Sequence, residues 1–92
     1  MTATVHAVFH GRVQGVWFRA WTQGEATKLG LSGWVRNRSD GTVEALFSGA
    51  PETVDAMLVK CRKGPPLARV DSITTEPAEA PTEAGFFKLP TA

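Results

Sequence analysis

The sequence predicts an α+β fold, in which an antiparallel sheet is covered on one face by two helices. Segments rich in β-branched and aromatic residues alternate with two segments of helical periodicity. Their order is strand, helix, strand, strand, helix, strand, which is the order of the ferredoxin-like split β-α-β sandwich. A chain of 92 residues has room for one core. We therefore expect a single domain over residues 1–92, with a short extra strand at the C-terminal edge of the sheet.

The N-terminal third of the chain predicts a strand, a loop and a helix. Residues 4–10 contain valine, threonine and phenylalanine at the density typical of a strand, and two glycines then interrupt the pattern in residues 11–15. Residues 18–29 can place their larger apolar side chains on one broad face, as an amphipathic helix does. Gly30 follows in the position that glycine commonly occupies just after a helix.

A hairpin is expected after the first helix. Residues 31–38 and 42–48 have the composition of strands, and the Ser-Asp-Gly sequence of residues 39–41 between them is typical of a tight turn. Alternate residues from Val43 to Phe47 are apolar and would point to one side of the sheet.

The second half predicts a helix and two more strands. Pro51 suits the first turn of a helix, and the Gly-Pro-Pro sequence of residues 64–66 ends it. The apolar stripe of this helix has the i, i+3, i+4, i+7 spacing and consists of Val54, Met57, Leu58 and Cys61. Residues 68–75 and 86–89 predict strands, the last of which is expected to end at Pro90.

Composition and charge exclude several classes of protein. Ten Lys and Arg residues against nine Asp and Glu leave a net charge of +1. The protein therefore lacks the broad positive field that attracts nucleic acids. The single cysteine, Cys61, excludes a disulfide scaffold. No apolar run is long enough for a transmembrane helix or a signal peptide. We expect a cytoplasmic monomer with neither nucleic-acid nor membrane partners.

The charge is distributed unevenly, and this points to an anion site. Residues 1–38 contain five basic residues and one acidic residue, whereas residues 39–92 contain five basic and eight acidic ones. In the basic half, residues 11–15 lead into a helix, whose free N–H groups and dipole carry about half a positive charge. Arg19 near the helix start has a planar guanidinium suited to two phosphate oxygens. A plain tight turn is the alternative interpretation of the loop taken alone.

Two longer motifs are more specific. Residues 11–19 read Gly-Arg-Val-Gln-Gly-Val-Trp-Phe-Arg, and residues 33–44 read Gly-Trp-Val-Arg-Asn-Arg-Ser-Asp-Gly-Thr-Val-Glu. These stretches resemble the two signatures of the acylphosphatase family, with Trp17 at the variable position of the first. Residues 64–71 are similar to the family's approach to its fourth strand, so the resemblance extends along nearly the whole chain.

The resemblance implies an enzyme that hydrolyses the carboxyl-phosphate bond of acyl phosphates to a carboxylate and inorganic phosphate, without a metal or other cofactor. Its partner is a small acyl phosphate, and a phosphate or sulfate anion could occupy the same site. Arg19 and Asn37 match the family's catalytic residues, of which the arginine binds the phosphate and the asparagine orients the attacking water. The implied phosphate-binding residues are Val13, Gln14, Gly15, Val16, Trp17, Phe18 and Arg19.

Other chemically distinctive residues have simpler interpretations. His6 and His10 would share the polar side of the first strand rather than act in catalysis, and Cys61 belongs to an apolar stripe, so it is expected in the core. Two interpretations of Trp17 stay open: contact with an aromatic acyl group, or packing. Three arginines are expected in solvent, where they would add diffuse attraction for anions: Arg12, Arg36 and Arg38.

Three other functions remain as alternatives. Split β-α-β sheets often bind RNA through aromatic residues on an open face, a role that Phe9, Trp34 and Phe47 could suggest. The net charge near zero and the absence of a Lys/Arg-Gly-Phe type signature argue against RNA binding. The second alternative is an acylphosphatase-type domain of a maturation factor, which usually lies in a longer chain with zinc-binding cysteines. The third is a small-molecule regulatory domain, which normally accompanies a catalytic domain.

Overall fold

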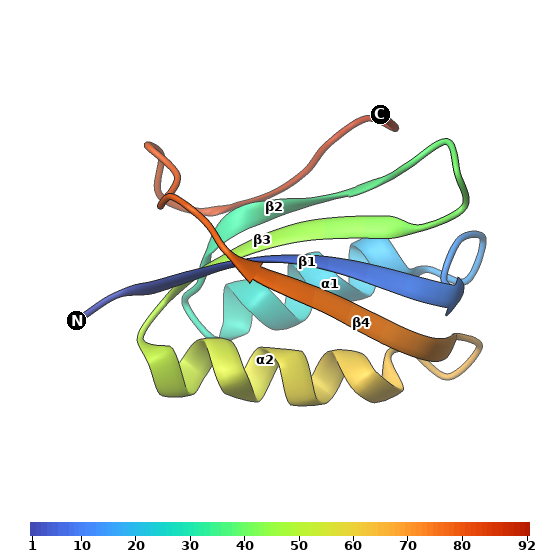
Figure 1. Cartoon of the computed structure of the whole chain (residues 1–92), viewed down its shortest axis with the longest axis horizontal. Coiled ribbons are helices and arrows are strands. Elements are labelled where there is room, and N and C mark those ends of the chain that lie inside the picture. The colour runs from blue at the N-terminus through green and yellow to red at the C-terminus, as the bar shows by residue number, and fades with distance from the viewer.

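The computed structural model describes residues 1–92 and has two layers, a five-stranded sheet and a pair of helices on one of its faces (Figure 1). The elements agree with the expected order and differ by a few residues at their ends. They are β1 (Ala3–Arg12), α1 (Phe18–Lys28), β2 (Ser32–Asn37), β3 (Val43–Gly49), α2 (Pro51–Lys63), β4 (Arg69–Pro77) and β5 (Phe86–Lys88).

The sheet has the strand order β4-β1-β3-β2-β5, with β1 and β3 near its centre. The four longer strands pair antiparallel, as predicted, while β5 runs parallel to β2 at the edge. The reason is topological, because β4 finishes at the end of the sheet where β2 begins. A chain that crosses from there to the β2 edge must then run in the same direction as β2.

The core lies between the sheet and the helices and is built around phenylalanine rings. Phe9 packs against Phe18 and Phe47, with ring centroids 5.1 and 6.4 Å apart, and Phe47 stacks on Phe86 at 5.6 Å. Cys61 is fully buried in the same core, and burial raises the pKa of its thiol to about 12. The thiol is therefore protonated and unreactive near neutral pH, which confirms its expected structural role.

β5 ends before Pro90, as the sequence predicts, but the chain continues along the edge of the sheet beyond it. The N–H of Leu89 donates to the carbonyl of Val35 at 2.9 Å, and the N–H of Ala92 donates to the carbonyl of Asn37 at 3.0 Å. Pro90 lies between these bonded residues, so its missing N–H interrupts no pairing. The backbone of Asn37 is consequently held by β3 on one side and by Ala92 on the other.

The opposite face of the sheet carries a charged network instead of helices. His6 on β1 contacts Glu44 on β3 with 2.7 Å between Nε2 and Oε2, and Arg36 on β2 bonds the other carboxylate oxygen of Glu44. The guanidinium of Arg36 also lies 4.8 Å from the ring centroid of Trp34. Arg36 is therefore half-buried and paired, and the expectation that it lies free in solvent was wrong, because β2 places it beside Glu44.

The Glu44 carboxylate couples this network to pH. Burial raises its pKa, but hydrogen bonds from His6 and Arg36 outweigh burial and hold the pKa below the ordinary value of 4.5. A carboxyl group whose pKa is depressed in the folded state stabilises the fold above its unfolded pKa. This contribution is lost as the pH falls through the folded-state pKa.

We predict that Glu44→Gln lowers the free energy of unfolding most at about pH 6 and that the deficit shrinks toward about pH 3. Urea unfolding of wild type and variant across this pH range measures the two free energies of unfolding. Subtracting one from the other removes the contribution of the other carboxylates, which titrate in both proteins. A deficit that is constant with pH would show that Glu44 does not titrate with a lowered pKa.

Candidate functional site

A cavity of about 320 Å³ lies where the loop after β1 meets the end of β2. Five of its lining residues come from the loop and the start of α1, and one comes from β2. They are Val13, Gly15, Trp17, Phe18, Arg19 and Asn37. All six are among the residues that the sequence singled out, so the fold brings the two signature motifs to one place.

The loop exposes its backbone because its apolar side chains are anchored in the core. Val13, Val16 and Phe18 are almost completely buried, whereas the residues between them are not. None of the backbone N–H groups from Gln14 to Ala20 donates a hydrogen bond within the chain. The N-terminal groups of α1 lack both a side-chain cap and an acidic residue in the first turn. The loop thus presents a row of free donors at the positive end of a helix dipole.

Gly15 has the conformation that this arrangement requires. Its φ of 73° lies in the left-handed region, where a side chain would be strained, although the space that a Cβ would occupy is open to 4 Å. The constraint is therefore the turn of the backbone and not the space around it. A glycine in a left-handed turn can direct successive N–H groups to the same side, as it does in anion-binding loops.

Gln14 fixes the loop against the β2–β3 hairpin. Its side-chain Nε2 donates to the carbonyls of Arg38 and Thr42, at 2.7 and 2.9 Å. Asn37 directly precedes Arg38, so these two bonds set the distance between the loop and Asn37. The resemblance implied Gln14 as a phosphate-binding residue, and no pattern in the sequence indicates this contact of its side chain across 24 residues.

Arg19 and Asn37 both have unused hydrogen-bonding capacity at the cavity. Arg19 is half-buried and makes no ion pair or hydrogen bond with another residue of the chain. The Oδ1 atom of Asn37 is buried and has no hydrogen-bond partner. A partly buried cation without a counterion and an unpartnered amide are the features expected of a site that awaits an anionic ligand.

The remaining candidates from the sequence lie away from this cavity. His6 and His10 project from β1 on the face without helices, where His6 contacts Glu44 and His10 approaches Thr74 at 3.4 Å. This confirms that they share the polar side of the sheet. His, Cys, Asp and Glu side chains do not gather into any group of three or more that could hold a metal ion.

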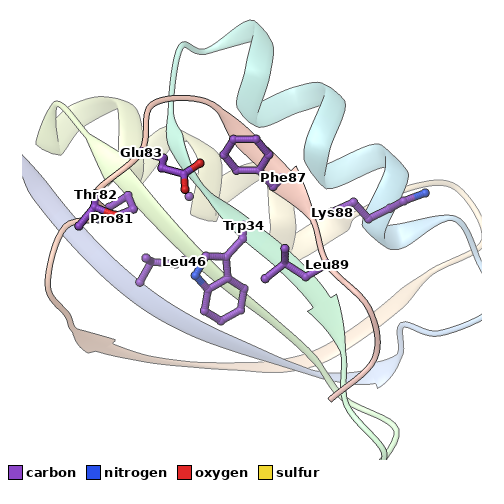
Figure 2. A pocket seen from close by; sticks show the side chains of 9 residues that line it. Trp34, Leu46, Pro81, Thr82, Glu83, Phe87, Lys88 and Leu89 are labelled. Carbon is purple, nitrogen blue, oxygen red and sulfur yellow. The ribbon is translucent and has the colours of Figure 1, made fainter.

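A larger hollow of about 530 Å³ lies on the face of the sheet without helices, beside the chain segment that leads into β5. Trp34, Leu46 and Leu89 lie together there, next to the loop that carries Pro81 and Glu83 (Figure 2). This hollow has neither the row of free N–H groups nor the unpaired arginine. We therefore place the candidate site at the smaller cavity.

The structure also removes the basis for an RNA-binding face. Phe9 and Phe47 are completely buried under the helices, whereas Trp34 lies on the opposite face of the sheet and contacts His6. The three aromatic residues thus do not form one surface on which bases could stack.

None of the helices has the length and apolar composition required to cross a membrane.

Comparison with known proteins identifies the family. The sequence profile of the acylphosphatase family matches residues 5–88. The acylphosphatase of Rhodospirillum rubrum is 59% identical over 80 residues, which cover 87% of this chain and 88% of that protein. An acylphosphatase structure from Coxiella burnetii superposes with a TM-score of 0.91 at 31% identity, covering 96% of this chain and 93% of that one. The crystal structure of the Bacillus subtilis acylphosphatase superposes with a TM-score of 0.87 at 34% identity, covering 97% of this chain and 98% of that one.

The fold and the cavity define a small α+β domain with a loop of free N–H groups at a helix N-terminus, a kind of site that suits anions. The chain belongs to the acylphosphatase family, and it is a hydrolase. The resemblance of its two motifs to the family signatures is thereby confirmed.

We predict that Gln14→Ala lowers the free energy of unfolding by about 1–2 kcal/mol, since it removes two hydrogen bonds to partly buried carbonyls. Urea unfolding monitored by circular dichroism measures the change. Gln23→Ala is the matched control, because Gln23 makes a single long bond of 3.3 Å to the carbonyl of Phe86. Equal losses in the two variants would contradict the anchoring role of Gln14.

Proposed function

We propose that the protein hydrolyses acyl phosphates to a carboxylate and inorganic phosphate at the cavity between the loop and Asn37. The observation that carries this proposal is the cavity itself, where unpaired N–H groups, an arginine without a counterion and an unpartnered amide lie together. The acylphosphatase family and the names of its relatives support the same reaction.

The loop and Arg19 bind the phosphoryl group in this mechanism. The free N–H groups of residues 14–18 donate to the phosphate oxygens, and the dipole of α1 adds a favourable potential. The guanidinium of Arg19 donates to two further oxygens through its planar fork. Phosphoryl transfer passes through a loose transition state with charge on the equatorial oxygens, so these fixed donors stabilise the transition state as well as the bound substrate.

Asn37 orients the attacking water. Its carboxamide offers both a donor and an acceptor. Its Oδ1 accepts no hydrogen bond from another residue of the chain, so it is free to accept one from water. The backbone of Asn37 is fixed by β3 and by Ala92, which limits the movement of the side chain. A neutral amide is too weak a base to remove a proton, so its contribution is to position the water in line with the bond that breaks. The proton of the water passes to a phosphate oxygen of the substrate.

The chemistry requires little else from the protein. An acyl phosphate is a mixed anhydride, and its leaving group is a carboxylate that departs without protonation by a general acid. The proposed residues include no metal ligand, so the reaction is expected to continue in the presence of EDTA. All the proposed groups belong to one copy of the chain, which supports action as a monomer, and we place that monomer in the cytoplasm.

We predict that Arg19→Ala lowers kcat/KM for benzoyl phosphate and acetyl phosphate by about 10²–10³, the effect of removing one preorganised donor from a developing negative charge. Phosphate release in the presence of EDTA measures the rate. Arg62→Ala removes the same charge from an exposed position on α2 and serves as the control. If both variants retain wild-type rates, the cavity is not the active site.

We predict that Asn37→Ala lowers kcat, with a loss of about 2–4 kcal/mol of transition-state stabilisation. KM is expected to stay within about threefold of the wild-type value, because Asn37 acts on the water and not on the substrate. Single-substrate kinetics with benzoyl phosphate separate the two constants. Ser39→Ala, a truncation in the same hairpin, is the control. An increase in KM at constant kcat would instead make Asn37 a substrate-binding residue.

A further inference from the structure

Trp17 is far more exposed than the other two tryptophans of the chain. It is 78% exposed, whereas Trp21 and Trp34 are half-buried. Trp21 packs on Phe18 with ring centroids 5.8 Å apart, and Trp34 packs on His6 at 6.2 Å. Trp17 takes part in no such ring contact. Of the two interpretations that the sequence left open, a packing role is therefore excluded.

The backbone of Trp17 has an unfavourable conformation. Its φ and ψ are 68° and 19°, and it is the only residue other than glycine with a positive φ. Bulky residues avoid this region because the Cβ atom approaches the backbone, and residues kept there cluster at functional sites. Glycine would relieve the strain, and yet the chain places its largest type of side chain at this position.

Trp17 lies at the edge of the proposed active site. It lines the cavity together with Arg19 and Asn37, and none of the other exposed large apolar residues does so. Asn37 reaches the cavity from β2, whereas Trp17 and Arg19 belong to the loop and the start of α1. In-line displacement requires the leaving group to depart on the side opposite the attacking water. The acyl group thus leaves on the side away from the attacking water, and Trp17 is the only exposed large apolar side chain among the residues that line the cavity.

We propose that the indole of Trp17 binds the acyl part of the substrate and makes the enzyme select acyl phosphates with an aromatic acyl group over acetyl phosphate. The proposal rests on the function proposed above. An aromatic acyl group can stack on the exposed indole, whereas an acetyl group offers only a methyl. The contact lies outside the phosphate-binding donors, so it changes selectivity between acyl groups without being required for phosphate binding.

The test compares kcat/KM for benzoyl phosphate with kcat/KM for acetyl phosphate in three proteins. Trp17→Ala and Trp17→Phe both carry a Cβ atom and so share the strain of the positive φ, but only the second has a ring. We expect Trp17→Ala to lower the ratio of benzoyl to acetyl kcat/KM by about three- to tenfold, and Trp17→Phe to keep it within about twofold of wild type. Val59→Ala is the control, since Val59 is 63% exposed on α2 and lines none of the cavities.

The outcomes separate the two proposals. If wild type hydrolyses both substrates and Trp17→Ala keeps the wild-type ratio, the acyl-binding role of Trp17 is wrong while the proposed function stands. If Trp17→Phe loses as much selectivity as Trp17→Ala, recognition by an aromatic ring is likewise wrong. If wild type releases phosphate from neither substrate, the proposed function itself fails, and the role of Trp17 fails with it.

Discussion

The contact between the side-chain amide of Gln14 and the carbonyls of Arg38 and Thr42 is the constraint on which the candidate site depends. One side chain of a short loop thereby bonds to both arms of a hairpin that lies 24 to 28 residues away. The N–H groups of the loop from Gln14 to Ala20 have no partner within the chain. The same contact holds Asn37 beside them, which turns two separate signature motifs into one cavity.

The two faces of the sheet have different physical roles. The face under the helices is apolar and packed against them, with Phe9, Phe47 and Cys61 completely buried. The other face carries a polar network around Glu44, whose carboxylate is shared between His6 and Arg36. Hydrogen bonds from His6 and Arg36 favour the charged form of the Glu44 carboxylate, so this face links the fold to pH.

The size of the protein fits the demands of the proposed reaction. A mixed anhydride is already activated, so fixed donors and one oriented water are sufficient, and a second domain or a cofactor pocket is not required. Most of the proposed donors are backbone N–H groups, whose positions follow from the course of the chain and not from side-chain rotamers. Anchoring Val13, Val16 and Phe18 in the core therefore positions donors that larger active sites supply from side chains.

The sequence by itself determined the order of the elements, the family and the residues of the cavity, because local patterns and two long motifs are properties of neighbouring residues. It predicted Arg36 wrongly and did not indicate that the chain beyond Pro90 stays bonded to β2, since pairing with Glu44 and with the edge of β2 depends on residues brought together only by folding. It also left open whether Trp17 packs or contacts an aromatic acyl group. Only the tertiary structure excluded packing, and it also decided the anchoring by Gln14 and the direction of β5. Each of these depends on which surfaces meet across the sheet, and that information is absent from any short stretch of the chain.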